Sequence, residues 1–566
     1  MPDKKKAHGV RRNLTNYGDH GFAAYLRRSF ARSMGYSKDM LERPIVGIAS
    51  SPSGFNNCHR SMPELVEAVK RGVLKAGGLP IDFPTISLGE VFLSPTSMMF
   101  RNLMSVDVEE MLRAQPIDAC VLIGGCDKTV PAQLMGAAAA NIPAIQLVTG
   151  PMLAMPYQGE RLGACTDCRR FWARYRAGEV SDEGIDDIEG NLATTAGTCA
   201  VMGTASTMAC ITEALGMGLP GSAAIPAVHA DRLRMAEMCG ERAMAMTLAG
   251  APLPSEIITP ASVRNAIRVL LAVSGSTNAV IHLTAIAGRR GIDIPLELLN
   301  RLSEETPVLV DLKPTGTHYM QDLFAAGGMH AVLYELRELL ELDCMTVTGE
   351  TLGVRLQNPP PYVDRAVIRP LEKPVQPHGG LVALFGSLAP QGAILKRAAA
   401  DPALFEREGR AVVFDSLEDL SARIDSDELD VAPEDFLVLK NAGPKSPSAM
   451  PEAGYLPIPR KLARAGVKDM VRISDARMSG TAFGTVVLHV SPDAASGGNL
   501  ALVRSGDRIV LSVREKRLDV LLSDDELNRR RAEWNPPDVP ERGYARLYRE
   551  HVLQATKGCD FDFLRV

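Results

Sequence analysis

The stretch DACVLIGGCDKTVPAQLMGAAAA, residues 118–140, joins two structural patterns across a short turn. DACVLIGG is a continuous apolar run with the length of a buried strand, and PAQLMGAAAA begins like a helix. Cys126, Asp127 and Lys128 therefore lie on a strand-to-helix turn. In α/β sheets such turns lie where ligands bind, and the following helix offers its N–H groups and the positive end of its dipole. Taken alone, the three residues fit two interpretations equally well: a ligand-binding turn, or a buried cysteine followed by a surface Asp–Lys pair.

The pattern around this stretch predicts the fold class. From Arg43 to about Pro374, short apolar runs such as PIVGIAS and IPAIQLVTG alternate with helical stretches such as MPELVEAVKRGVLKAG. This alternation predicts an α/β domain with a mostly parallel, helix-covered sheet. After KPVQPHGG, strand-like runs such as GLVALFG, EDFLVLKN and GTVVLHVS dominate. We therefore predict an N-terminal α/β domain over residues 1–374 and a C-terminal β-rich, barrel-like domain over residues 375–566.

Composition excludes several classes of function. The chain has 566 residues and a net charge of −5, which argues against nucleic acid as a partner. The N-terminal segment MPDKKKAHGVRRN has no apolar core of a secretory leader, and no stretch approaches the roughly 18 apolar residues of a membrane helix. We expect a soluble, cytoplasmic protein. Ten cysteines in so long a chain favour reduced thiols or metal ligands over a disulfide scaffold.

Three cysteines lie in turn-like settings directly before helical stretches: Cys58 in SGFNNCHRSMPEL, Cys126, and Cys199 in TTAGTCAVMGTASTM. They can share a metal centre only if the fold brings three distant loops together. Three thiolates would leave one iron of a cluster open, as a Lewis-acid cluster requires. Four other cysteines lie within helix or strand patterns and are expected to be small core residues. They are Cys120, Cys210, Cys239 and Cys344.

Cys165 and Cys168 form a CxxC pair, a spacing that binds zinc or forms a redox disulfide. No second CxxC or HxxxH at zinc spacing accompanies the pair. The RRFWARYR that follows is a basic, amphipathic stretch. A zinc-binding structural protein built on this pair is therefore the weakest of the functional alternatives.

Acidic residues occur in similar settings. Glu90 in PTISLGEVFLSPTSM follows a predicted strand and a glycine, and Glu452 in GPKSPSAMPEAG lies in a loop rich in proline and glycine. With Asp127 they offer the hard oxygen ligands that Mg²⁺ prefers. Each of them alone fits equally well as an acid at a helix start.

Six blocks, in order, carry a family resemblance. They are NNCH, SLGEVFLSPTSM, GGCDKTVPAQLMGAA, GTCAVMGTASTM, GPKSPSAMPE and SDARMSGTAFGTVVLHVSPDAA. From about Arg43 to near its end the chain resembles the dihydroxy-acid and sugar-acid dehydratases, the IlvD/Edd family. The region around RMSGTAFG is more similar to the pentonate and hexonate dehydratases than to the enzymes of branched-chain amino acid biosynthesis.

The resemblance implies two inorganic groups. A [2Fe–2S] cluster would be held by Cys58, Cys126 and Cys199, although three cysteines can equally hold a [4Fe–4S] cluster. A nearby Mg²⁺ would be held by Glu90, Asp127, Glu452 and a carbamoylated Lys128. The loop before Glu452 has KSPSAMPE where family members commonly have more glycine, as in KGGPGMPE.

Lys128 is unexpected beside a cation, because an ammonium has no lone pair and repels Mg²⁺. Burial favours the neutral amine, which reacts with CO₂ to give an anionic carbamate with two oxygen donors. The alternative is a lysine that reaches outward to pair with an acid. Burial of the side chain distinguishes the two.

The resemblance also implies that Ser479 is the catalytic base, with Thr481 beside it in the same small-residue turn. A serine needs a nearby cation to act as a base, and without the family context Ser479 fits an ordinary turn or helix-cap serine. Arg477 is a candidate for binding a carboxylate and His489 for moving a proton. Both have equally plausible structural roles, as does His59.

The sequence thus predicts a hydro-lyase that converts an aldonic acid into a 2-oxo-3-deoxy acid. Dihydroxy-acid dehydratase is the first alternative; a 6-phosphogluconate enzyme ranks third, because no Walker-type loop and no evident Lys/Arg cluster is present for a phosphate. An iron–sulfur redox sensor is the alternative from another class. We expect a small-molecule sugar acid or dihydroxy acid as substrate, no nucleic-acid or membrane partner, and a homodimer or homotetramer, as is usual in the family.

Overall fold

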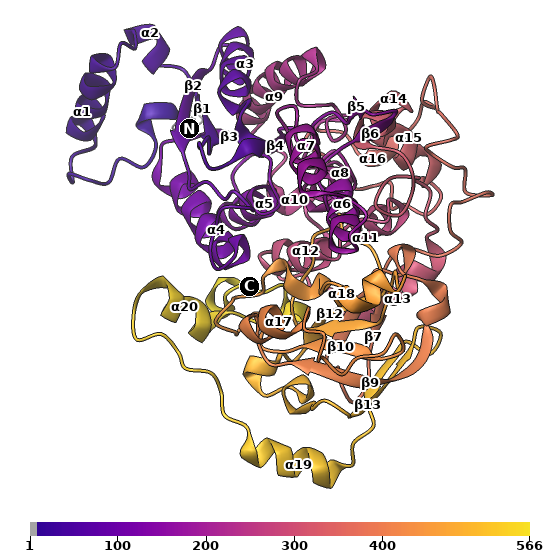
Figure 1. Ribbon diagram of the computed structural model, residues 1–566. Helices are drawn as coiled ribbons and strands as arrows, with labels where there is room; N and C mark the ends of the chain where they lie inside the picture. Colours follow the sequence, from indigo (N-terminus) through magenta and orange to yellow (C-terminus); the bar gives the residue numbers. More distant parts are fainter. Residues whose placement is uncertain (1–7) are drawn as a thin grey trace.

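The computed structural model describes residues 8–566 (Figure 1). A four-stranded parallel sheet with the order β2-β1-β3-β4 forms the centre of the N-terminal half. Its strands are β1 (Ile45–Ser50), β2 (Leu79–Pro84), β3 (Ala119–Gly124) and β4 (Ala144–Val148). Three of them are buried along their whole length, as expected of strands covered by helices on both faces. The predicted α/β fold of this half is confirmed.

Helices cover both faces of this sheet. On one side α3 (Met62–Lys75) packs against α9 (Ala230–Ala249), and on the other α4 (Ser97–Ala114) packs against α5 (Thr129–Ala140). The α3–α9 contact is close because of Gly72, where a Cβ atom would lie 2.0 Å from the Glu237 carbonyl oxygen.

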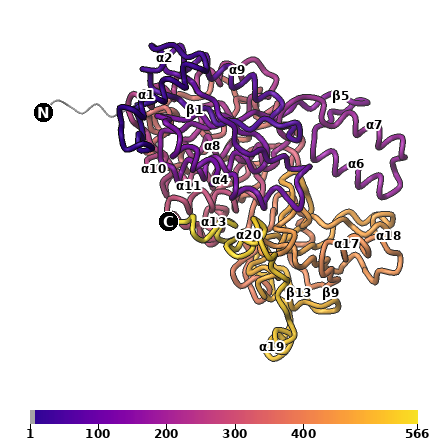
Figure 2. Tube along the Cα trace, turned by 90° about the vertical axis from the view of Figure 1, so that its left-hand side faces the viewer, coloured from indigo at the N-terminus to yellow at the C-terminus, as the bar shows by residue number. Residues whose placement is uncertain are grey.

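The remaining helices of this half surround the same core. They are α1 (His20–Ser33), α2 (Lys38–Leu41), α8 (Thr204–Ala214), α10 (Pro254–Ile257), α11 (Pro260–Ala272), α12 (Asn278–Gly288), α13 (Leu296–Glu305), α14 (Met320–Ala325), α15 (Gly328–Glu335) and α16 (Leu352–Arg355). A hairpin of β5 (Met155–Tyr157) and β6 (Glu160–Leu162) precedes α6 (Thr166–Arg176) and α7 (Asp182–Leu192). Figure 2 shows α6 and α7 projecting from this half on the same side as α17 (Leu417–Arg423) and α18 (Arg460–Arg464) of the C-terminal half.

The C-terminal half is built on an eight-stranded mixed sheet with the order β14-β13-β9-β10-β11-β12-β8-β7. Its strands are β7 (Val382–Leu384), β8 (Gly392–Leu395), β9 (Glu406–Phe414), β10 (Phe436–Leu439), β11 (Arg472–Ser474), β12 (Val486–Ser491), β13 (Arg508–Ser512) and β14 (Arg517–Val520). Phe385, directly after β7, bridges to Arg517 at the start of β14. The sheet is therefore nearly closed, and the predicted β-rich, barrel-like architecture is confirmed.

Four helices accompany this sheet: α17 (Leu417–Arg423), α18 (Arg460–Arg464), α19 (Asp524–Glu533) and α20 (Gly543–His551). After α19 the chain returns to the N-terminal half, where the Tyr544 hydroxyl donates to the Met99 carbonyl at 2.6 Å. The buried Arg289, directly after α12, pairs with Asp560 at 2.6 Å. These contacts join the two halves, whereas the predicted boundary near residue 375 stays a prediction.

No helix between residues 8 and 566 is long and apolar enough to cross a membrane. The prediction that MPDKKKAHGVRRN has no apolar core of a secretory leader concerns in part residues 1–7, which lie outside the described residues.

Candidate active site

The predicted strand-to-helix turn lies between β3 and α5, and its shape depends on close backbone contacts. A Cβ atom on Gly125 would lie 2.3 Å from Oγ1 of Thr149, so only glycine fits there. Cys126 follows with a positive φ of 21°. The imidazole of His59 holds the turn: Nδ1 donates to the Ser51 carbonyl at 2.8 Å, and Nε2 accepts from the Gly125 N–H at 3.1 Å. Burial lowers the pKa of His59 to about 4, which keeps the ring neutral and able to accept. His59 therefore has a structural role.

The structure brings the three predicted cysteines together. Cys58, in the 3₁₀ turn η2 (Asn57–His59), lies next to the buried Cys126, and its proximity together with burial raises the pKa of Cys126 well above its usual value. A hydrogen bond with Cys165 does the same for Cys199, and the nearby Asp127 and Cys58 raise its pKa further. The sulfur atoms of Cys199 and Cys165 are 3.6 Å apart. The CxxC pair, which the sequence presents as a separate feature, therefore adjoins these cysteines.

The predicted acidic residues lie next to this group and are paired by one arginine. Arg477 is fully buried and donates from Nη2 to Glu90 and from Nη1 to Glu452, both at 2.7 Å. Although burial alone would raise it, the pKa of Glu90 is held well below its usual value by Arg477 and Lys128. Burial raises the pKa of Glu452, and it raises that of Asp127 to about 7, with a further contribution from the other two carboxylates.

Lys128 is fully buried, and its Nζ lies 3.2 Å from Oε2 of Glu90. The outward-facing lysine that the sequence left open is therefore excluded. The side chain lies among carboxylates, at the position immediately before α5.

Ser479 and Thr481 lie in the turn between β11 and β12. Their hydroxyl oxygens are 2.8 Å apart, and the Thr481 N–H donates to Oγ of Ser479 at 3.4 Å. Gly203 connects this turn to the thiols, because a Cβ atom there would lie 2.9 Å from Cγ2 of Thr481 and 3.8 Å from Cβ of Cys199. The turn of the C-terminal half thus lies against the loop that carries Cys199.

Sequence reasoning missed two buried basic residues at the site. Lys396 has no exposed surface, donates from Nζ to the Gly480 carbonyl at 3.3 Å, and has a pKa that burial lowers to about 7. His282 on α12 accepts from Arg101 at 3.1 Å, and burial together with the charge of Lys128 lowers its pKa well below the usual value. Neither lies in one of the conspicuous blocks, and burial is the only signal that distinguishes them. His489, a proton-transfer candidate, is buried with a pKa lowered to about 3.

The residues present fit an iron–sulfur cluster and a divalent cation by their chemistry. Among residues 8–566 no three His, Cys, Asp or Glu side chains are arranged as ligands around one point. The three carboxylates nevertheless have few balancing charges, chiefly Arg477 and Lys128 with a smaller contribution from Arg169 at Glu452, and burial together with the neighbouring carboxylates raises the pKa of Asp127. A divalent cation would supply the missing charge. Thiols that converge beside them are the donor type for iron.

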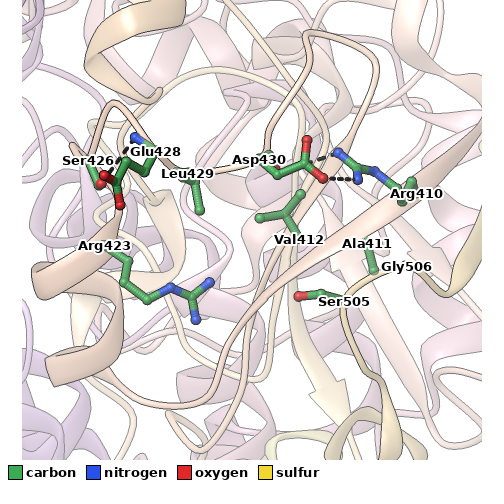
Figure 3. A pocket seen from close by; sticks show the side chains of 10 residues that line it. All are labelled: Arg410, Ala411, Val412, Arg423, Ser426, Glu428, Leu429, Asp430, Ser505 and Gly506. Atoms are coloured by element: carbon green, nitrogen blue, oxygen red, sulfur yellow. Dashed lines mark hydrogen bonds and ion pairs between the residues drawn. The ribbon is translucent and has the colours of Figure 1, made fainter.

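Two cavities differ in their relation to this site. One, of about 800 Å³, adjoins the thiols and is lined by α6, by Tyr455 of the 3₁₀ turn η5 (Glu452–Tyr455), and by Phe483. The other, of about 510 Å³, lies over β9 and contains none of the predicted residues (Figure 3). Arg410 and Asp430 form an ion pair across its rim.

Comparisons with known proteins agree with this arrangement. The N-terminal model of the dihydroxy-acid/6-phosphogluconate dehydratase family matches residues 43–355, and its C-terminal model matches residues 366–559. L-arabinonate dehydratase of Rhizobium leguminosarum bv. trifolii is 46% identical, with 99% of this chain and 98% of that protein covered. 6-Deoxy-6-sulfo-D-gluconate dehydratase of Pseudomonas putida is 42% identical (100% and 98% covered). Dihydroxy-acid dehydratase of Caldanaerobacter subterraneus subsp. tengcongensis is 38% identical (94% and 96% covered).

Proposed function

The chain belongs to the dihydroxy-acid/6-phosphogluconate dehydratase family, and from this premise we propose that it dehydrates an aldonic acid to a 2-oxo-3-deoxy acid. The relatives are named dehydratases, so the chain is a hydro-lyase that acts on a dihydroxy acid. A sugar acid is favoured because the L-arabinonate dehydratase is 46% identical to the chain, whereas the dihydroxy-acid dehydratase is 38% identical.

One observation carries the proposal: thiols, carboxylates and a hydroxyl from both halves lie at one partly buried site. The thiols come from the loops around Cys58, Cys126 and Cys199, whereas Ser479 and Glu452 come from the C-terminal half. A redox sensor would need the cysteines but neither the three carboxylates nor the paired Ser479 and Thr481. This arrangement therefore supports catalysis over sensing.

The two inorganic groups implied by the family are part of the proposal. Cys58, Cys126 and Cys199 would hold a [2Fe–2S] cluster, which supplies a Lewis acid for the departing C3 hydroxyl. Glu90, Asp127, Glu452 and a carbamoylated Lys128 would hold Mg²⁺, which stabilises negative charge at the substrate's carboxylate end. The burial of Lys128 supports the carbamate.

We assign the C2 proton to Ser479. A neutral serine is a weak base, and its alkoxide needs donors and positive charge. Toward an alkoxide at Oγ of Ser479, Thr481 would donate from its hydroxyl, which lies 2.8 Å away, and from its N–H, which lies 3.4 Å away. Lys396 adds a buried amine that holds the Gly480 carbonyl between these two residues. Loss of the C3 hydroxyl then leaves an enol, which tautomerises to the 2-oxo acid.

An anaerobic experiment tests the proposal. The purified protein is analysed for its visible spectrum, iron and labile sulfide, and is then assayed with Mg²⁺ against pentonates, hexonates and 2,3-dihydroxyisovalerate for 2-oxo acid formation. We expect turnover of sugar acids with about two irons per chain, the content of one [2Fe–2S] centre. Turnover of 2,3-dihydroxyisovalerate alone would favour the branched-chain alternative, and an intact cluster without any turnover would favour the sensor. Zinc without iron would contradict both the iron–sulfur dehydratase and the iron–sulfur sensor.

Two further proposals concern the state of the protein. We propose that the chain forms a homodimer or homotetramer, which sedimentation equilibrium would measure. We also propose a cytoplasmic location, which fractionation of the producing cells would test.

A further inference from the structure

The cavity next to the thiols has an unusual charge balance. Its lining includes five basic side chains, Arg169, Arg170, Arg174, Arg176 and Lys468, and only one acid, Glu179. Four of the five basic residues come from the segment at α6, and Lys468 comes from the loop before β11. An excess of positive charge around a partly enclosed space favours an anionic ligand.

Three of these basic residues have partners within the chain. Arg170 pairs with Glu160 at 2.7 Å, Arg174 pairs with Glu179 at 3.2 Å, and Arg176 pairs with Asp425 at 2.6 Å. Their charges are therefore balanced without a ligand. The Arg176 pair also fixes α6 on the C-terminal half, where Arg176 additionally donates to the Ile458 carbonyl at 3.0 Å.

Arg169 and Lys468 differ from these three. Between residues 8 and 566, neither side chain has a carboxylate within ion-pair distance or a hydrogen bond. Nε of Arg169 is buried without a partner. A buried guanidinium nitrogen without an acceptor is costly, so such a group is expected to have a ligand.

Tyr455 holds Arg169 in place. The guanidinium lies over the Tyr455 ring at 5.0 Å from its centroid, and Arg472 lies at 4.9 Å from the same centroid. Arg472 is itself fixed by Asp469 at 2.6 Å and by the Tyr455 carbonyl at 2.9 Å. The ring is thus a rigid platform that orients Arg169 without neutralising it.

The position of the cavity indicates which end of a substrate would reach it. Glu90 and Glu452, two of the proposed Mg²⁺ ligands, are joined by Arg477 and mark the site where the C1 end is expected. The thiols, expected near C3, come next, and Cys165 lies 3.6 Å from Cys199 on the side of the cavity that also contains Arg169. Carbon atoms beyond C3 therefore extend toward the cavity.

We propose that the cavity is a subsite for a second anionic group on the terminal carbon of the substrate, bound by Arg169 and Lys468. The inference rests on the proposed function and specifies its substrate class: an aldonic acid that ends in a phosphate, sulfonate or carboxylate. The shared chemistry is an oxyanion, which a guanidinium binds with two parallel hydrogen bonds.

Matched acids test the proposal in the holoenzyme. D-Gluconate is compared with 6-phospho-D-gluconate, 6-deoxy-6-sulfo-D-gluconate and D-glucarate, and L-arabinonate with its 5-phosphate. We expect kcat/KM to be higher for at least one terminally charged acid by about tenfold or more, the factor that one charged hydrogen bond supplies. The preference should decrease as salt is added. The charged acid with the largest kcat/KM relative to its neutral counterpart identifies the terminal group.

Variants separate this role from others. Arg169→Gln should lower kcat/KM for the preferred charged acid by about tenfold or more, mainly through KM, and leave its neutral counterpart nearly unchanged. Arg169→Lys should restore part of the preference, and Lys468→Gln should reduce it independently. Arg529→Gln, on α19 outside the cavity and paired with Glu526 at 2.7 Å, is the matched control and should change the use of neither acid.

Three results would overturn the inference. The first is an equal kcat/KM for charged and neutral acids throughout the panel. The others concern Arg169→Gln: an equal loss of kcat/KM for the charged and the neutral acid, or an unchanged preference for the charged acid. An equal loss would assign Arg169 to the C1 carboxylate or to folding. If no acid is turned over, the proposed function fails. Calorimetric binding of the same matched pairs to the unchanged chain and to Arg169→Gln then decides the subsite by itself.

Discussion

Arg477 and Glu90, 387 positions apart in the sequence, form a partly buried ion pair in which Nη2 of the guanidinium donates to Oε1 of the carboxylate at 2.7 Å. The other arm of the same guanidinium donates to Glu452 at 2.7 Å, and Nε donates to the Met450 carbonyl at 2.9 Å. One cation therefore connects a loop of the N-terminal half with two loops of the C-terminal half. The position of the proposed Mg²⁺ ligands relative to one another depends on it.

Arg477→Met should therefore destabilise the protein strongly. The change leaves Glu90 and Glu452, whose side chains are only 18% and 22% exposed, with less compensating charge, and removal of one partner of a buried pair costs about 3–5 kcal/mol. Urea unfolding of the purified chain would measure the loss. Arg508→Met is the matched control, because its pair with Glu408 is half exposed and should contribute less than about 1 kcal/mol. An equal effect of the two substitutions would contradict this account.

Ser479→Ala should remove the proposed base without disturbing the site. We expect kcat to fall by about 10²–10⁴-fold, the usual contribution of a positioned general base, while binding of the substrate persists. Thr481→Val removes one donor toward Oγ of Ser479 and should have a smaller effect of the same kind. Steady-state kinetics and calorimetry on the loaded enzyme would measure both. Ser426→Ala, in the remote cavity of Figure 3, should retain full activity.

The cysteines should divide into two groups by iron content. Single changes of Cys58, Cys126 or Cys199 to Ser should each abolish the visible absorption and the bound iron. Cys239→Ser, in the core far from these loops, should keep both. Cys165→Ser should also retain iron, because the family resemblance assigns three ligands only. Loss of the cluster in Cys165→Ser would instead make this residue a fourth ligand.

Lys396 should make stability depend on pH in the alkaline range. In the unfolded chain this lysine stays protonated up to about pH 10.4, whereas burial lowers its pKa to about 7 in the folded protein. Between these values the unfolded state binds more protons, so the contribution of Lys396 to the free energy of unfolding becomes more favourable as pH rises.

Lys396→Met removes this contribution. Its gain in stability over the unchanged chain should be greatest below pH 7 and should shrink by up to about 4 kcal/mol toward pH 10. Melting temperatures of both chains at pH 6, 8 and 9.5 would show it. A stability difference that is independent of pH would mean that folding does not lower the pKa of Lys396. The loss of the bond to the Gly480 carbonyl should in addition lower kcat.

Much of the fold follows from local patterns. The apolar runs at residues 45–50, 119–124 and 144–148 are strands of one parallel sheet, and the strand-like runs after residue 375 form the second sheet. These patterns are predictable because a strand covered on both faces needs a continuous apolar run, and a helix needs a regular apolar stripe. Which strands are neighbours does not follow, since the order β2-β1-β3-β4 depends on packing between distant segments.

Cys165 and Lys396 show the limit of local patterns at the site. The CxxC pair looks like an independent zinc motif in the sequence, but the fold places Cys165 beside Cys199. Lys396 lies in an ordinary strand end, and only its complete burial next to Gly480 distinguishes it. Burial and contact between distant residues have no local sequence signal, because both arise when the core closes.

The sequence by itself determined the residue types of the site, the strand-to-helix turn that carries Cys126, Asp127 and Lys128, and the two kinds of sheet. Only the tertiary structure decided that Lys128 is buried against Glu90, that Arg477 joins Glu90 to Glu452, and that Arg169 remains without a carboxylate partner among the described residues. The physical reason is that side-chain chemistry and backbone periodicity are local properties, whereas charge balance is decided by which distant groups share the same buried space.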